Sequence, residues 1–481
     1  MTKYHADVAL QSIPTLLLLE YPELQDQGIV CMDSWPITDP IIAVFHPDMM
    51  AQFAQNLSLP KSDILRQVFG GFTGCQDLVC AEGSHWKKWR SIFNSGFSNK
   101  NILSLIPAFI EEINIFKDIL VDAAGSGRTM QLITPATKAT CDVIGRAISG
   151  ARLGIQTSES RLYKAMKHQL ALAHLPRGLK LWRDCNLWRH FKLWNNNRIM
   201  HTELMPDIER EFRDTGMGGG SKTITGLAVE AYLKENGDII SATRKDQLFD
   251  SDFLSVVLAQ IKIFLVAGHD TTASTLCYVY YCLHRDPAVA DRVRAEHDAI
   301  LGTDPSAAAT VLADDPSILH RLIYTSAVIK ETLRLYPPAA TLRAGTRNLE
   351  LVHPETRQRF STEGFTLLAA SQTAHRHPAY WPQPDTFLPE RWLAREGDRL
   401  HPLKDAWRPF ELGPRNCIGQ ELAMAELKLI LALTVREVDV VPAYSDAAPR
   451  LFGEVAYQIY DPNEINNRPK DGMPVRVKLR A

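Results

Sequence analysis

A single cysteine stands in the stretch RPFELGPRNCIGQELA, residues 408–423, just ahead of an apolar run that favours a helix. A cysteine that binds a metal must be a thiolate, and the positive N-terminal end of such a helix would stabilise the thiolate of Cys417. One thiolate cannot complete a zinc site, but it can be the axial ligand of a haem iron, where it favours cleavage of bound oxygen. The alternative is a buried structural cysteine, the common fate of a free thiol.

The residues around this cysteine are suited to a haem. Gly413 and Gly419 would let the loop backbone turn tightly and approach the macrocycle, and Arg415 is suited to bind a carboxylate such as a haem propionate. With Phe410 and Cys417 they complete the pattern FxxGxRxCxG. This pattern resembles the haem signature of the cytochromes P450. The resemblance implies that Cys417 is the fifth ligand of the iron in haem b.

Polar residues interrupt a second, apolar stretch, IKIFLVAGHDTTASTLCYVYY at residues 261–281. It resembles the AGxDTT segment with which the family activates oxygen. The resemblance implies that Ala267 and Gly268 lie beside the oxygen site, that Asp270 acts as an acid, and that Thr271 is the alcohol of the proton network. The alternative is a long core helix with satisfied hydroxyls and an exposed aspartate.

A third pattern is a pair of charges in VIKETLRLYPP, residues 328–338, where Glu331 and Arg334 share one face of a predicted helix. Such pairs are usually solvated surface charges. Downstream, PQPDTFLPERW at residues 382–392 resembles the PxxFxPxRW segment of the family. The resemblance implies a buried cluster of Glu331, Arg334 and Arg391 that locks the haem-binding core, in which the loss of one member would leave a charge unpaired.

A fourth pattern, HWKKWR, places Trp86 and Arg90 one helical turn apart, so that both side chains can reach one propionate. It resembles the WxxxR pair of the family. Arg343 and Arg415 are further candidates for propionate contacts, and Arg347 lies close enough to Arg343 in sequence to compete for this role.

The elements that must position these residues are mainly helical. Residues 101–120 and 139–150 carry apolar side chains at spacings of three and four. Residues 28–47 predict a β-hairpin, and short β-type runs return at 365–370 and 473–479. We therefore expect a mainly α fold with small β-sheets. By resemblance this is the cytochrome P450 fold, with the haem between the oxygen-activating helix and the helix after the cysteine loop.

Residues 28–481 read as one catalytic domain, because no long linker divides them. The segment 1–27 contains an apolar run that Gln11, Ser12 and Pro14 interrupt, whereas a membrane span needs ~20 apolar residues. We therefore expect no clear transmembrane anchor there.

The composition excludes several classes of function. The 481 residues carry a formal net charge of −2 with scattered charges, so no basic stripe is available for nucleic acid. The eight cysteines form no CxxC pair and indicate a reducing compartment. No flavin or nicotinamide fingerprint appears, so an oxidative enzyme of this sequence would need an external redox partner.

The resemblance implies a monooxygenase that inserts one oxygen atom from O2 into a hydrophobic organic substrate. Its electrons would come from NADPH through a cytochrome P450 reductase, for which Lys87, Lys88 and Lys428 would form a basic docking face, unless these lysines only solvate their helices. Resemblance to fungal members that tailor secondary metabolites suggests a polyketide or a terpenoid as substrate.

Family resemblance also implies the cytosolic face of the endoplasmic reticulum, with peripheral membrane contact through the apolar and basic residues 171–182. Three other functions stay open at this point. They are a haem-thiolate isomerase or dehydratase without a reductase, a monooxygenase that detoxifies foreign compounds, and a haem sensor without catalysis.

Overall fold

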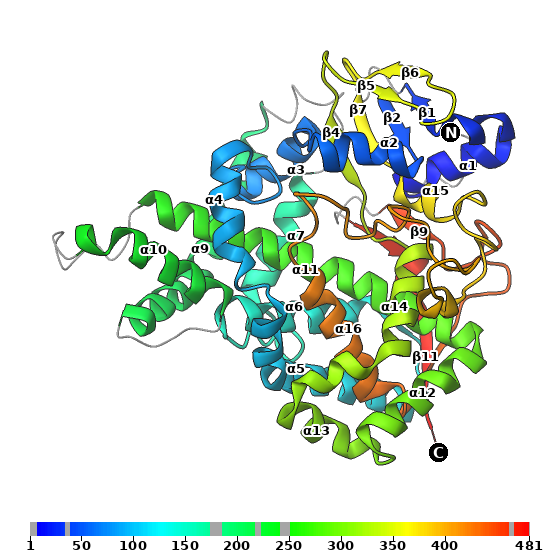
Figure 1. The fold of residues 1–481 in the computed structure, drawn as a ribbon. Helices are drawn as coiled ribbons and strands as arrows, with labels where there is room; N and C mark the ends of the chain where they lie inside the picture. The colour runs from blue at the N-terminus through cyan, green and yellow to red at the C-terminus, as the bar shows by residue number, and fades with distance from the viewer. Residues whose placement is uncertain are drawn as a thin grey trace.

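Helices form most of the chain in the computed structural model, which describes residues 7–33, 39–173, 185–216, 223–240, 251–460 and 466–480 (Figure 1). The helices of eight or more residues are α1 (Ile13–Glu20), α3 (Asp63–Thr73), α4 (Gly83–Asn94), α5 (Asn99–Ser126), α6 (Ile133–Ser149), α7 (Arg161–Ala173), α9 (Leu187–Gly216), α10 (Ile224–Ile240), α11 (Ser251–Arg285), α12 (Pro287–Leu301), α14 (Ile323–Leu335) and α16 (Gln420–Thr434). The shorter ones are α2 (Pro47–Ala51), α13 (Ala308–Asp314) and α15 (Ser371–His375). The prediction of a mainly helical fold is confirmed.

The largest sheet has four strands in the order β1-β2-β7-β4. Its strands are β1 (Ile29–Met32), β2 (Ile41–Val44), β7 (Thr366–Ala369) and β4 (Thr341–Ala344). β1 and β2 pair antiparallel, which confirms the two strands of the predicted hairpin, while its turn lies outside the described residues. β2 pairs parallel with β7, and β4 pairs antiparallel with β7. The sheet therefore joins segments from opposite parts of the sequence.

Three smaller sheets complete the strand content of the described residues. Their strands are β3 (Met130–Gln131), β11 (Pro474–Leu479) and β8 (Val438–Pro442) in one sheet, β9 (Gln458–Tyr460) and β10 (Asn467–Pro469) in another, and β5 (Glu350–Val352) and β6 (Arg359–Ser361) in the third. In β11, Val475 and Val477 are buried whereas Arg476 and Lys478 are exposed, which is the period-two pattern of a half-buried strand.

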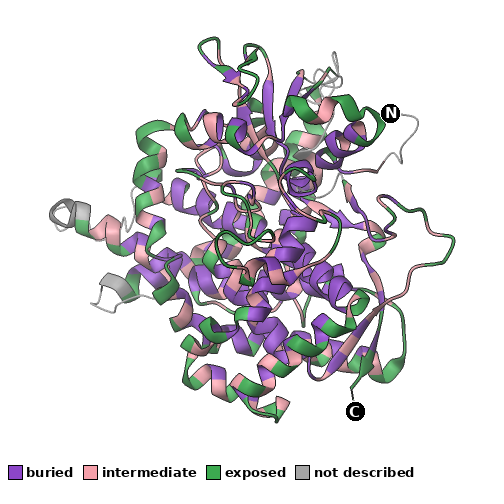
Figure 2. Cartoon of the chain, turned by 45° about the vertical axis from the view of Figure 1, so that its right-hand side comes forward, coloured by how far each residue is buried: buried purple, intermediate pink, exposed green. Residues whose placement is uncertain are grey.

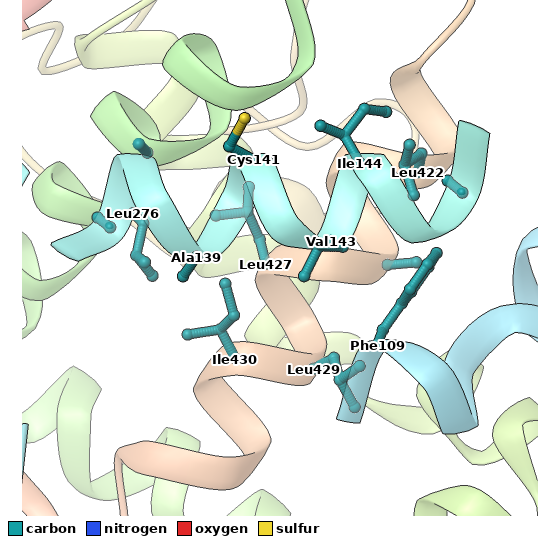
Figure 3. Packing of buried hydrophobic residues seen from close by; sticks show 14 of the residues in the cluster. Phe109, Ala139, Cys141, Val143, Ile144, Leu276, Leu422, Leu427, Leu429 and Ile430 are labelled. Carbon is teal, nitrogen blue, oxygen red and sulfur yellow. The ribbon is translucent and has the colours of Figure 1, made fainter. Parts of the chain in front are cut away.

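The helical core is built around α6, which is buried along nearly its whole length. Buried residues fill the interior of the molecule, and exposed residues lie on its outer helices and loops (Figure 2). In Figure 3, side chains of α6 gather with those of α5, α11 and α16, including Phe109, Leu276 and Leu427. Gly268 of α11 lies against α6, because a Cβ atom at this position would be 3.1 Å from Cγ1 of Ile144. The glycine therefore allows the two helices to pack closely.

α11 is the central long helix of the fold (Figure 1). Among the described residues it is the one helix that is long and apolar enough to cross a membrane, and most of its apolar part is buried inside the protein. Its length of 35 residues corresponds to about 50 Å at 1.5 Å per residue. α11 thus reaches from one side of the helical core to the other and can present residues to several neighbours.

Candidate active site

Cys417 lies in the loop that leads into α16, and main-chain hydrogen bonds fix this loop. The Cys417 N–H donates to the carbonyl of Phe410 at 2.8 Å, and Asn416 N–H donates to the carbonyl of Gly413 at 3.1 Å. The thiol is solvent-accessible, yet burial raises its pKa, against the lowering effect of the Gly419 N–H and of Arg90. Cys417 is therefore accessible and yet has protein groups packed around it.

Gly413 shapes this loop by its backbone. Its φ of 88° lies in the left-handed region, and a Cβ atom there would be 2.7 Å from the Cα of Gln55. Both the conformation and the close approach require glycine. Gly419, at the N-cap of α16, is close to the thiol, since a Cβ atom there would be 3.9 Å from Sγ of Cys417.

Phe97 connects the cysteine loop to α11. Its ring lies 5.0 Å from that of Phe264 on α11 and 3.9 Å from the position of a Cβ atom on Gly419. One turn further along α11, Ala267 is exposed and Thr271 half-buried in a stretch of otherwise mostly buried residues. The Thr271 hydroxyl donates to the carbonyl of Ala267 at 2.9 Å. The middle of α11 thus presents an accessible small residue and a hydroxyl close to the cysteine loop.

Asp270 points to a different neighbour. It is 2% exposed, accepts from Nε of Arg468 at 2.7 Å, and accepts from Nδ2 of Asn466 at 3.2 Å. The exposed aspartate of the alternative interpretation is therefore wrong. The Asp270 carboxylate is the partner of a guanidinium from β10, so it can act as an acid only when this ion pair opens; that role stays a prediction.

Glu331, Arg334 and Arg391 come together at the end of α14, and all three are 0% exposed. Arg334 donates to both carboxylate oxygens of Glu331 at 3.0 and 2.8 Å, and Nε of Arg391 donates to the same group at 3.2 Å. The indole of Trp392 and the N–H of Leu388 also donate to Glu331. The carboxylate is thus saturated with donors, as a buried charge requires, and the surface-pair alternative does not apply.

His375 extends this cluster toward the cysteine loop, and sequence reasoning missed it. Burial, with Arg334 nearby, lowers the pKa of His375 to about 3, so the ring is neutral. Its Nε2 accepts from the Arg408 N–H at 2.9 Å, and its Nδ1–H therefore donates to the carbonyl of Arg334 at 3.0 Å. The only signal in the sequence was the HRHP stretch ahead of the PxxFxPxRW segment.

Arg90 and Arg415 bind protein groups that hold the cysteine loop against α4. Arg90 donates to the main-chain and side-chain oxygens of Asn416, both at 2.9 Å. Arg415 pairs with Glu82 at 2.7 Å, donates to three carbonyl oxygens of residues 78–81, and lies 4.5 Å from the ring of Trp86. These side chains already have partners in the protein. The propionate contacts of Trp86, Arg90 and Arg415 therefore stay predictions.

The sequence model of the family described as cytochrome P450 matches residues 19–458 of the chain. The chain belongs to the cytochrome P450 family. Cytochrome P450 monooxygenase polC of Polytolypa hystricis is 36% identical over 96% of this chain and 83% of its own length. Cytochrome P450 monooxygenase acrF of Aspergillus aculeatus is 32% identical over 93% of each chain.

Solved structures agree on the fold. The haem domain of cytochrome P450DA superposes with a TM-score of 0.74 at 20% identity, over 99% of this chain and 93% of the other. Cytochrome P450 CYP102L1 superposes with a TM-score of 0.77 at 20% identity, over 99% and 100% of the two chains. The predicted cytochrome P450 fold is confirmed, and the chain is a monooxygenase that carries haem on a cysteine thiolate.

The residues of this cytochrome P450 fit such a cofactor. Arg343 of β4 is 0% exposed and donates from Nη1 to the carbonyl of Leu59, whereas Nε and Nη2 have no partner among the residues that the structure describes. Burial and the neighbouring Arg415 lower the pKa of Arg343 to about 10, and burial with Arg343 lowers the pKa of Lys61 to about 7. Buried donors of this kind need an anion, which the haem propionates would supply.

Arg347, the competing candidate, is exposed and pairs with Glu363 at 2.8 Å on the surface. The geometry thus favours Arg343 over Arg347 as a propionate ligand. Lys61 was not found from the sequence, because it belongs to no pattern of fixed spacing and approaches Arg343 only through an isolated β-bridge between the two residues.

Proposed function

We propose that Cys417 is the fifth ligand of the haem iron and that this enzyme inserts one oxygen atom into a hydrophobic organic substrate. The observation that supports this most is the accessible Cys417, in a loop that Arg90 and main-chain hydrogen bonds fix. When bound, the haem supplies a thiolate-ligated iron that activates O2 once two electrons have arrived.

Residues of this chain would hold the haem and supply a proton at the oxygen site. Arg343 and Lys61 would bind the propionates by charge-assisted hydrogen bonds, and Arg90 keeps the cysteine loop in place through Asn416. The Thr271 hydroxyl, which is bonded to the Ala267 carbonyl, would turn toward the oxygen site and give up the proton on Oγ1 there as it accepts another from solvent. The cluster of Glu331, Arg334 and Arg391 keeps the underlying core rigid.

The ligand assignment is tested with Cys417→Ala and Cys417→His, the second of which keeps an iron ligand but no thiolate. We expect both variants to lose the red-shifted ferrous carbon monoxide band that thiolate ligation gives, with haem content measured in parallel. Cys31→Ala, which removes another exposed thiol, is the control and should keep the band. A red-shifted band in either Cys417 variant would contradict the assignment.

The role of Thr271 is tested by the coupling of NADPH use to product. We expect Thr271→Ala to keep haem but to lose ~10-fold or more in product yield, with the electrons appearing as peroxide. Thr275→Ala removes a buried hydroxyl one turn further along α11 and should leave the coupling unchanged. An unchanged yield in Thr271→Ala would remove this residue from the mechanism.

For electron supply we propose an NADPH–cytochrome P450 reductase that docks on α4. Lys87 and Lys88 are exposed there, whereas Lys428 is half-buried and donates to the carbonyl of Leu319 at 2.9 Å. Lys87 and Lys88 thus remain the candidate contacts. Stoichiometric uptake of NADPH and O2 during turnover is the expected result, and turnover without either would favour an isomerase or dehydratase.

For the substrate we propose a fungal secondary metabolite, a polyketide or a terpenoid. The support is the similarity to cytochrome P450 monooxygenases of Polytolypa hystricis and Aspergillus aculeatus. Mass spectrometry of the source organism with and without the gene should show a precursor that accumulates and a product, one oxygen atom heavier, that disappears. No change while the gene is expressed would favour detoxification of foreign compounds.

For localisation we propose peripheral contact with the cytosolic face of the endoplasmic reticulum through the start of α9. Leu187, Trp188, Phe191 and Trp194 are 83%, 64%, 52% and 56% exposed on one helical face. Lys192 and Arg198 lie over the two indoles, at 5.3 and 5.7 Å. Aromatic and basic residues on one face are typical of helices at a lipid surface. Residues 174–182 of the predicted membrane segment lie outside the described residues.

The membrane contact is tested by sedimentation with vesicles that contain anionic lipid. We expect the double variant Trp188→Gln/Trp194→Gln to bind ~10-fold more weakly than the unchanged enzyme. Leu403→Gln, which alters an exposed apolar residue elsewhere, should bind normally. Equal binding of all three proteins would contradict the proposed contact.

A further inference from the structure

A cavity of about 500 Å³ lies beside α7, and the site described above does not use it. Its wall is formed by α6, by α7 with the segment before it, and by β10. Lys138, Lys164, Lys167 and Arg468 line this basic cavity, together with the hydroxyls of Ser160 and Tyr163. A volume of this size is typical of a small-molecule site.

The charge of the basic cavity favours an anion. Among the described residues, its lining contains one carboxylate, that of Glu159, which pairs with Lys164. Lys138 and Lys167 add positive charge on neighbouring helices, and Arg468 is 9% exposed at the inner end. Cationic side chains that converge with hydroxyls on one cavity are the groups that recognise carboxylates and phosphates.

The basic cavity lies across α11 from the oxygen site. Residues of a helix turn by ~100° each, so His269 points roughly opposite to Ala267. The His269 ring contacts Tyr163, a lining residue, at 6.1 Å. Burial lowers the pKa of His269, Asp270 and the Leu265 carbonyl oppose this, and Arg468 and Lys167 lower the pKa further, so both cations lie near this side of α11. A ligand here is therefore distinct from the compound that is oxidised.

Arg468 links the two sides of α11. Arg468 lines the basic cavity, and its guanidinium binds Asp270, the neighbour of Thr271 in the oxygen-activating helix. An anion in the cavity would share this guanidinium with Asp270. If the anion competed for Arg468, it would weaken the ion pair between Arg468 and Asp270. Asp270 can act as an acid only when this ion pair opens.

We propose that the basic cavity is a binding site for a small carboxylate or phosphate effector, whose binding reaches the oxygen-activating helix through Arg468 and Asp270. This inference goes beyond the proposed monooxygenase function, because anion binding can be measured on the haem-loaded protein without any turnover. Loss of activity in the tests above and loss of anion binding are separate results.

Binding is tested by isothermal titration calorimetry of the haem-loaded protein with citrate and with inorganic pyrophosphate, at an ionic strength held constant with chloride. We expect saturable binding of at least one probe, and the tighter one identifies the carboxylate or the phosphate class. The double variant Lys138→Gln/Lys167→Gln should bind at least ~10-fold more weakly, since each lysine contributes a charge-assisted contact.

The matched control is Lys100→Gln/Lys404→Gln, which removes two exposed lysines elsewhere and changes the net charge equally. It should bind the probe as the unchanged protein does. Absence of saturable binding for both probes would overturn the site. An equal loss in the two double variants would also overturn it, because the binding would then reflect only the overall charge.

The link to α11 is tested by hydrogen–deuterium exchange of the haem-loaded protein with and without the bound probe. We expect altered exchange in the segments around Asp270 and β10, and no alteration when the probe is added to Lys138→Gln/Lys167→Gln. Saturable binding with unchanged exchange in α11 would overturn the coupling and leave the binding site.

Discussion

Glu331 is the one negatively charged member of the buried cluster that it forms with Arg334 and Arg391. Its carboxylate faces two guanidiniums, and all three side chains are fully buried. We expect Glu331→Gln to destabilise the folded protein by about 3–5 kcal/mol, because two buried cations lose their counter-charge. Glu363→Gln breaks the exposed pair with Arg347 and should cost at most about 1 kcal/mol. Urea unfolding of the two variants checks this, and equal shifts would contradict the proposed role of Glu331.

His375 should make the folded state sensitive to acid. Its pKa in the fold is about 3, whereas a histidine in an unfolded chain has a pKa near ~6.5. Between these values the unfolded chain binds a proton that the folded chain does not. The stabilising contribution is therefore complete above pH ~6.5 and is lost as the pH falls toward ~3, by up to about 1.4 kcal/mol per pH unit.

We expect His375→Gln to show a smaller loss of unfolding free energy between pH ~6.5 and ~5 than the unchanged protein, because one titrating group has gone. The measurement is urea unfolding at several pH values. His320→Gln, at an exposed position, is the control. If the free energy of unfolding changes with pH equally in His375→Gln and in the unchanged protein, the proposed contribution of His375 is wrong.

The cysteine loop depends on its backbone as much as on its thiol. Gly413 and Gly302 have nearly the same φ, 88° and 87°, but a Cβ atom on Gly302 would meet no atom within 4 Å. Gly302 combines this φ with a ψ of 158°, and we expect Gly302→Ala to cost ~1–3 kcal/mol through this backbone conformation alone. Gly413→Ala should cost more and reduce haem content, because its Cβ would clash with the main chain of Gln55. Equal stability and haem content of the two variants would contradict this.

Much of the site was predictable where residues lie close together in the sequence. The FxxGxRxCxG loop, the AGxDTT segment and the pair of Glu331 and Arg334 each sit on one element. Contacts between distant elements were not predictable in this way. Arg468 meets Asp270 across 198 residues from a three-residue strand, and periodicity carries no signal for a strand that short. Arg90 and Arg415 had recognisable positions, but their protein partners depend on the packing of α4 against the loop.

At the scale of the whole molecule, the last strand closes the core. β11 is the middle strand of its sheet, and Val475 and Val477 are buried against the helices. We expect removal of residues 474–481 to prevent formation of soluble haem-loaded protein, since each buried valine contributes roughly 1.5–3 kcal/mol. Removal of residues 480–481 alone takes away the partly exposed pair of Arg480 with Asp439 and the main-chain hydrogen bond from the Arg480 N–H to the Glu437 carbonyl, and should be tolerated. Soluble expression and haem content distinguish the two outcomes.

The parallel pairing of β2 with β7 has a consequence for synthesis on the ribosome. Ile41 pairs with Thr366, more than 300 residues later in the chain. At roughly 5–20 residues per second, the apolar strand β2 waits between about 15 s and a minute for its partner. During this time the apolar side chains of β2 that will be buried against β7 face solvent, although β2 can already pair with β1. Long-range pairing of this kind is slow even once the chain is complete. The first strands that the ribosome releases are thus among the last to be covered, and during this interval β2 is a segment on which chaperones that shield apolar surface would act.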